Sequence, residues 1–93
     1  MKNFTLRLNI QSYKYLKNQS EYFGITLAGL LKYKLFELKG NELTNIDFEN
    51  LDTVRMTLVI PNDFYNSVES YAIKNSMSIN KYINLLFLNY LNN

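Results

Sequence analysis

Two short stretches of the chain alternate apolar and polar residues, as a β-strand does when one of its faces lies against a core. They are residues 4–8 (FTLRL) and residues 56–60 (MTLVI). A strand of this length is not stable alone, and its open edge needs a partner. The pattern therefore predicts that the two strands pair into an antiparallel ribbon with helices beneath its apolar face.

The two stretches belong to a longer internal repeat. Thr5 aligns with Thr57 and Thr26 with Ser78, in each case 52 positions later and without a gap. Identity between the copies is low, but the apolar positions agree. The other matched pairs are Leu6 and Leu58, Leu8 and Ile60, Tyr13 and Tyr65, Leu16 and Val68, Leu27 and Ile79, Leu31 and Ile83, and Leu35 and Phe87. The repeat predicts two units of the same architecture.

In the first unit, helical apolar spacing follows the strand. Asn9 is placed to cap a helix that ends at Gly24, because glycine tolerates the left-handed conformation that closes a helix. Thr26 then caps a second helix, from Leu27 to about Lys39. We expect inward-facing residues at Tyr13, Leu16, Ser20 and Phe23 in the first helix, and at Leu27, Leu30, Leu31, Leu35 and Leu38 in the second.

The second unit repeats this plan. Pro61 ends the strand and suits the first turn of a helix, where its missing N–H costs nothing. That helix fades at residues 75–76, and Ser78 caps the last helix. We expect inward-facing residues at Phe64, Tyr65, Val68, Tyr71 and Ala72, and then at Ile79, Tyr82, Ile83, Leu86, Phe87 and Tyr90.

An acidic stretch separates the units. We expect residues 1–40 to form the first unit, residues 41–52 a linker, and residues 53–93 the second unit, with one shared core. The linker holds four acidic residues and no basic one, and we interpret these as solvated charge that keeps it away from phosphates. Its apolar residues indicate that it lies over the surface or forms a short helical turn. They are Leu43, Ile46, Phe48 and Leu51.

The composition of the chain excludes several kinds of catalytic and metal-binding site. The chain has no Cys and no His, which excludes disulfides, thiolate zinc sites and nucleophilic machinery built on Cys or Ser-His. We expect no enzyme activity, no cofactor and no small-molecule substrate. No apolar run approaches the roughly 20 residues that span a bilayer, so we expect a cytoplasmic protein without a membrane partner. The eight tyrosines lie mostly on apolar stripes, which favours packing over stacking with single-stranded nucleic acid.

The order strand, helix, tight turn, helix resembles the ribbon-helix-helix family of DNA-binding proteins, the MetJ and Arc repressor superfamily. Residues 4–9 look like the family's strand, and residues 24–26 (GIT) resemble its Gly-x-Ser/Thr turn. Residues 76–78 (SMS) fill that place in the second unit, with Ser where Gly is usual. The resemblance implies a mainly α fold with a two-stranded antiparallel ribbon, built as a single-chain pseudo-dimer, as in some accessory proteins of plasmid conjugation.

The outward face of the ribbon is the candidate base-reading surface. Pairing centred on Thr5 and Thr57 places Arg7 across from Arg55, at one end of the ribbon, so the site read is expected to be asymmetric. Arg donates two hydrogen bonds to guanine, Asn pairs with adenine and Thr contacts several bases. The predicted base-contacting residues are Asn3, Thr5, Arg7, Arg55, Thr57 and Val59. The alternatives are a solvated strand face and, for Val59, a packing contact or a lost one.

Helix starts supply the candidate phosphate contacts, because their free N–H groups and dipole attract anions. Thr26 and Ser78 act as helix caps in either case. Since Lys81 has no basic counterpart at Gly29, we expect the second clamp to be the stronger. The predicted phosphate-contacting residues are Thr26, Leu27, Ala28, Ser78, Ile79, Asn80 and Lys81.

Three functions follow as hypotheses. The first is a sequence-specific double-stranded DNA-binding protein, a transcriptional repressor that inserts its ribbon into the major groove. The second is an accessory protein of plasmid transfer or partition that uses the same surface. The third is a protein-interaction module without DNA binding, which the net charge of only +2 favours and the paired arginines oppose. Because one ribbon covers few base pairs, we also expect copies of the chain on adjacent DNA sites.

Overall fold

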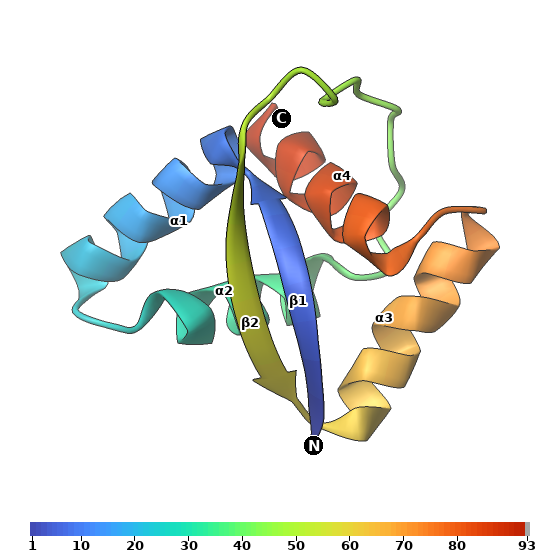
Figure 1. Ribbon diagram of the computed structural model, residues 1–93, viewed down its shortest axis with the longest axis horizontal. Coiled ribbons are helices and arrows are strands. Elements are labelled where there is room, and N and C mark those ends of the chain that lie inside the picture. Colours follow the sequence, from blue (N-terminus) through green and yellow to red (C-terminus); the bar gives the residue numbers. More distant parts are fainter. Residues whose placement is uncertain (93) are drawn as a thin grey trace.

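The computed structural model describes residues 1–92, which form two strand-helix-helix units (Figure 1). The first unit consists of β1 (Lys2–Asn9), α1 (Ile10–Phe23) and α2 (Leu27–Leu38). The second consists of β2 (Thr53–Ile60), α3 (Asn62–Lys74) and α4 (Ile79–Leu91). The expected fold class is confirmed: the protein is mainly α, with one two-stranded antiparallel sheet built from two repeated units. None of the helices in this part of the chain is long and apolar enough to cross a membrane.

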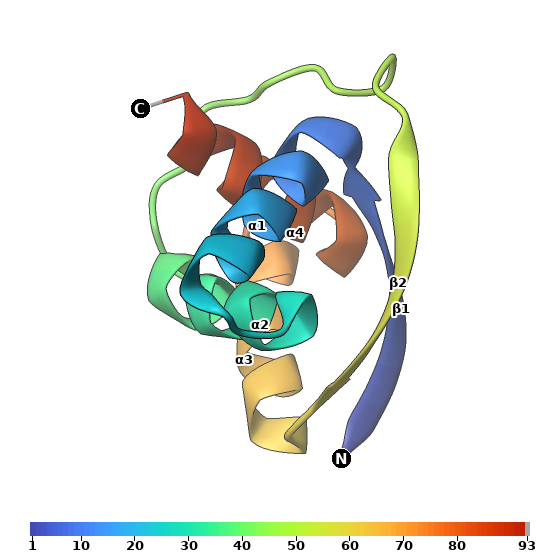
Figure 2. The same ribbon diagram turned by 90° about the vertical axis from the view of Figure 1, so that its left-hand side faces the viewer.

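The two strands pair along their whole length, from Lys2 opposite Ile60 to Asn9 opposite Thr53. Thr5 lies opposite Thr57, so the predicted register is confirmed. Figure 2 shows the ribbon along one side of the molecule, with the helices together on the other side. The inner face is therefore covered and the outer face is open. The most buried inner residues are Leu6, Leu8, Leu58 and Ile60.

Both helix pairs are joined by the same turn, although the residues differ. Gly24 has a positive φ of 68°, and the N–H groups of Gly24 and Ile25 donate to the carbonyls of Glu21 and Ser20. The N–H groups 52 positions later repeat both bonds. There Ser76 takes the left-handed conformation, with a φ of 57°. Since this conformation strains any residue that has a Cβ, the second turn is the less stable one.

The predicted helix caps are confirmed. Asn9, Thr26 and Ser78 each accept a hydrogen bond from the N–H three residues later, at 2.9, 3.1 and 3.1 Å. Pro61 precedes α3, which no side chain caps. The caps of α2 and α4 thus fix where these two helices begin, which is on the side of the ribbon in Figure 2.

One hydrophobic core lies beneath the ribbon and contains residues of both units. Helix α4 is its most buried element, because it contacts β1 and all three other helices. Every residue from Tyr82 to Leu88 is buried. The inward position predicted for Phe23 is wrong: its side chain is 61% exposed, because it is the last residue of α1 and no element covers it.

The linker between α2 and β2 runs along α4 (Figures 1 and 2). The backbone N–H of Thr44 donates to Oδ1 of Asn89 at 2.8 Å, and Nδ2 of Asn89 donates to the carbonyl of Thr44 at 2.9 Å. As expected, the linker lies over the surface. Its half-buried apolar residues are Leu43, Ile46, Phe48 and Leu51.

Candidate nucleic-acid interface

The outer face of the ribbon brings together the six residues that the sequence singled out. All of them are exposed, and each lies at an alternate position of its strand. Arg7 lies opposite Arg55, and Asn3 lies opposite Val59, whose side chain is 44% exposed. The face therefore carries hydroxyl, amide and guanidinium groups along its length. From β1 come Asn3, Thr5 and Arg7, and from β2 come Arg55, Thr57 and Val59.

The two ribbon arginines have no acidic partner within residues 1–92, where the one salt bridge joins Lys34 to Glu37. Like charges on directly opposed strand residues repel each other. Arg7 and Arg55 therefore form an exposed cationic pair that a ligand with acceptor atoms would stabilise.

Asn84 fastens the free edge of β1 to α4, and sequence reasoning missed it. Its Oδ1 accepts from the backbone N–H of Asn9 at 2.7 Å and from the Asn9 side chain at 3.0 Å. Its Nδ2 donates to the carbonyl of Arg7 at 2.9 Å, and the Arg7 N–H donates to Oδ1 of Asn80, also at 2.9 Å. Asn84 is completely buried. The sequence did hold a signal for this role, since Asn84 is the one amide within the apolar run 82–88, and a buried amide needs hydrogen-bond partners.

The free edge of β2 is held more weakly. Nζ of Lys32 donates to the carbonyl of Val59 at 3.4 Å, and this bond is exposed. Lys32 and Val59 lie 52 positions from Asn84 and Arg7, so the two contacts are equivalent in the repeat. The backbone from Arg7 to Asn9 is therefore fixed by several short hydrogen bonds, of which those of Asn9 are buried, whereas the backbone at Val59 is held by one long bond.

Helices α2 and α4 both begin on the ribbon side of the molecule, where the structure places the seven predicted phosphate-contacting residues. The first N–H groups of a helix have no acceptor within the helix. At these starts the hydroxyls of Thr26 and Ser78 accept a hydrogen bond from the third N–H group of the helix. The first two N–H groups of each helix are left for another acceptor. At α2 the residues are Thr26, Leu27 and Ala28, and at α4 they are Ser78, Ile79, Asn80 and Lys81.

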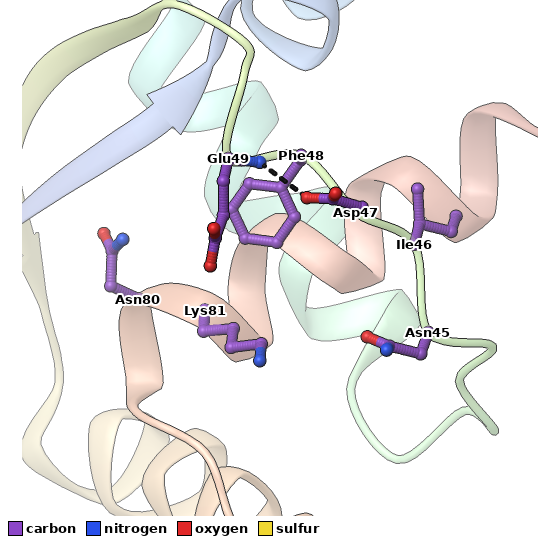
Figure 3. A pocket seen from close by; sticks show the side chains of 7 residues that line it. All are labelled: Asn45, Ile46, Asp47, Phe48, Glu49, Asn80 and Lys81. Carbon is purple, nitrogen blue, oxygen red and sulfur yellow. Dashed lines mark hydrogen bonds between the residues drawn. The ribbon is translucent and has the colours of Figure 1, made fainter.

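The linker brings negative charge to the start of α4. A cavity of about 440 Å³ is lined by residues 45–49 together with Asn80 and Lys81. Figure 3 shows the carboxylate of Glu49 pointing toward Asn80 and Lys81, while that of Asp47 accepts the N–H of Glu49 at 3.1 Å. These carboxylates share a cavity with Lys81 and offset part of its positive charge, and the greater strength of the clamp at α4 stays a prediction. Within residues 1–92 no three acidic side chains gather as a metal site would require.

Charge is distributed unevenly along the chain. Residues 1–40 carry seven basic and two acidic side chains, a net charge of +5. The linker carries −4 and residues 53–93 carry +1, which gives the total of +2. Because the linker lies along α4, the first unit presents most of the positive charge.

Two of the tyrosines that the sequence placed on apolar stripes, Tyr82 and Tyr90, take part in helix packing, and Tyr15 joins them. Tyr82 is completely buried, burial raises the pKa of its hydroxyl, and its oxygen accepts the N–H of Gly40 at 3.1 Å. The hydroxyls of Tyr15 and Tyr90 lie 3.2 Å apart. This hydrogen bond raises the pKa of Tyr15 and lowers that of Tyr90, which Lys34 also contacts. These rings are part of the helix packing and do not form a stacking platform.

A scan against protein-family models, a search of curated proteins and a search of solved structures each found no match to this chain. The likeness to other proteins therefore rests on the fold alone. Two strand-helix-helix units pair their strands antiparallel, in a topology that resembles a tandem ribbon-helix-helix pseudo-dimer.

Proposed function

We propose that this chain is a sequence-specific double-stranded DNA-binding protein of the ribbon-helix-helix kind. The observation that carries the proposal is the open outer face of the ribbon, where Arg7 and Arg55 lie opposite each other with no acidic partner among residues 1–92. The apolar inner face of the ribbon is packed on helices, so the outer face is free to meet a ligand.

The ribbon would enter the major groove, which is wide enough for two strands. Arg7 and Arg55 would donate to guanine O6 and N7 at one end, and Thr5 and Thr57 would contact bases at the centre. Asn3 and Val59 would meet the other end, which makes the recognised sequence asymmetric. The N–H groups at the starts of α2 and α4 would bind phosphates on either side of the groove.

We propose that the biological role is transcriptional repression by occupation of an operator. An accessory role in plasmid transfer or partition would use the same contacts, and differs in the genomic site that is bound. Since one ribbon covers few base pairs, copies of the chain would occupy adjacent sites. Sedimentation at saturating DNA would then detect more than one chain per duplex, and a ratio of one would contradict this part of the proposal.

The test is a titration of the purified protein against random duplex DNA at low and moderate salt, followed by selection and sequencing of the bound duplexes. We expect a short asymmetric motif and an affinity that falls as salt rises. The variant Arg7→Ala/Arg55→Ala should lose roughly a hundredfold in affinity for that motif, since each bidentate contact discriminates by about 1–3 kcal/mol.

The matched control is Lys14→Ala/Lys17→Ala, which removes the same charge from the exposed surface of α1. It should lower affinity for all duplexes weakly and leave the selected motif unchanged. If the folded protein retains no duplex at low salt, the proposal is wrong, and the same scaffold would instead serve as a protein-interaction module.

A further inference from the structure

Helices α2 and α4 occupy equivalent places in the repeat, but only α4 has its outer face covered. Leu85 on α4 is 1% exposed, whereas Tyr33, 52 positions earlier on α2, is 61% exposed. The linker contributes to the difference, because it runs along α4 and bonds to Asn89 one turn after Leu85. Figure 1 shows the linker and the turn between α1 and α2 on opposite sides of the ribbon.

The uncovered face of α2 holds an apolar groove of about 520 Å³. Two pairs of equivalent residues show that this groove on α2 corresponds to the surface of α4 along which the linker runs. Gly29 and Lys34 line the groove, and Lys81 and Leu86, 52 positions later, line cavities beside the linker. Gly29 has no side chain, which leaves the groove open. Its lining residues are Phe23, Ile25, Gly29, Leu30, Tyr33 and Lys34.

Neither the core nor the ribbon explains the exposed apolar side chains at this groove. Phe23 is 61% exposed and Ile25 is 48% exposed, and neighbouring Tyr22 is 82% exposed. Exposed apolar side chains that gather at one place are typical of an interaction site. A partner that covered them would bury rings which now contact water.

The linker shows which kind of chain fits such a helix face. It is extended, its apolar residues Leu43, Ile46 and Phe48 are half-buried, and acidic residues lie between and beside them. The one charged residue that lines the groove on α2 is Lys34, which is paired with Glu37 at 3.5 Å, and the unit around the groove carries a net charge of +5. Apolar side chains would fill the groove while carboxylates face the basic surface.

We propose that the groove on α2 is a docking site for an extended segment of a partner protein, in which apolar side chains are separated by acidic residues. The segment would lie along α2 as the linker lies along α4. This site is separate from the outer face of the ribbon, so it does not depend on DNA binding. If the ribbon does bind DNA, the partner would be held beside it.

The test uses a labelled synthetic peptide with the sequence of residues 41–52, added to the full-length protein. Fluorescence anisotropy measures binding, and amide chemical shifts locate it. We expect saturable binding with shifts at the groove residues, and a loss of about tenfold or more in Tyr33→Ala, because buried aromatic anchors dominate such interfaces. Tyr33 is exposed, so this variant should stay folded.

Two controls sharpen the result. Ile73→Ala removes a similarly exposed apolar side chain from α3, away from the groove, and should bind the peptide normally. A peptide with Ser in place of Leu43, Ile46 and Phe48 keeps the charge and should not bind. Absence of binding at millimolar peptide, or shifts confined to α4 or the ribbon, would overturn the proposal. So would a dimer of the protein that Tyr33→Ala dissociates, because a second copy would then occupy the groove.

Discussion

The two units have the same architecture but differ in how their second helices are used. In α4 all residues from Tyr82 to Leu88 are buried, whereas α2 buries Leu30, Leu31 and Leu35 and exposes Tyr33. In a symmetric homodimer one sequence must serve both halves. A single chain is free of that constraint, and here one half has specialised in holding the fold while the other presents charge and an apolar groove.

The difference extends to the ribbon. Asn84 fixes β1 through one buried and one part-buried hydrogen bond to the backbone, while the equivalent Lys32 gives β2 one exposed bond. The linker carboxylates lie beside the start of α4 and not beside that of α2. If the ribbon reads DNA as proposed, the two ends of its site should therefore differ in geometry and in charge.

The largest effect is expected at Asn84. Asn84→Ala removes the partners of the Asn9 amides and the Arg7 carbonyl inside the protein. Leaving a buried polar group unpaired costs about 1–3 kcal/mol, so the free energy of unfolding should fall by roughly 3 kcal/mol or more. Urea unfolding followed by circular dichroism measures it.

Lys32→Ala is the equivalent change in the other unit. Because the Lys32 contact is exposed, it should cost about 0.5 kcal/mol or less. If both variants lose the same stability, the two strand edges are held equally and the asymmetry described above is wrong.

The next effect concerns the two turns. Ser76→Gly should raise the free energy of unfolding by about 1 kcal/mol, because glycine adopts the left-handed conformation without strain. Gly24→Ser should lower it by about the same amount. Thermal and urea unfolding of both variants check the pair. Two changes of the same sign would show that the turns are not equivalent.

The smallest effect concerns the linker and rests on the proposed function. Asp47→Asn/Glu49→Gln removes the carboxylates beside the start of α4, where a DNA phosphate would bind. Since a charge at a helix start is worth about 0.3–1 kcal/mol, affinity for the selected duplex should rise by about two- to fivefold. A fluorescence titration measures the change.

The matched control for the linker variant is Glu42→Gln/Asp52→Asn, which removes the same charge from other positions of the linker. It should raise affinity less. An equal rise in both variants would mean that only the net charge of the protein matters, and not the position of Asp47 and Glu49.

The sequence predicted those features that depend on local pattern. The alternation in the strands and the offset of the repeat gave the register, and cap residues gave the helix starts. The repeat aligned Ser76 with the glycine of the first turn, and Ser76 adopts the left-handed conformation that glycine has there. Strand pairing and capping each depend on a few neighbouring residues, so one sequence is enough to predict them.

The features that it did not predict depend on contacts between distant segments. The exposure of Phe23 follows from the absence of any covering element, which helical spacing does not reveal. The bonds of Asn84 reach residues 75 and 77 positions away. The place of Glu49 beside Lys81 depends on the path of the linker. Whether the six outward ribbon residues contact bases stays a prediction.

The most direct test of DNA reading is a map of amide chemical shifts in the protein with and without the selected duplex. The account predicts large shifts at residues 3–7 and 55–59 and at the starts of α2 and α4, with unequal shifts at the two starts. It predicts small shifts in the groove of α2. Shifts confined to that groove or to the lysines of α1, with the ribbon unchanged, would contradict it.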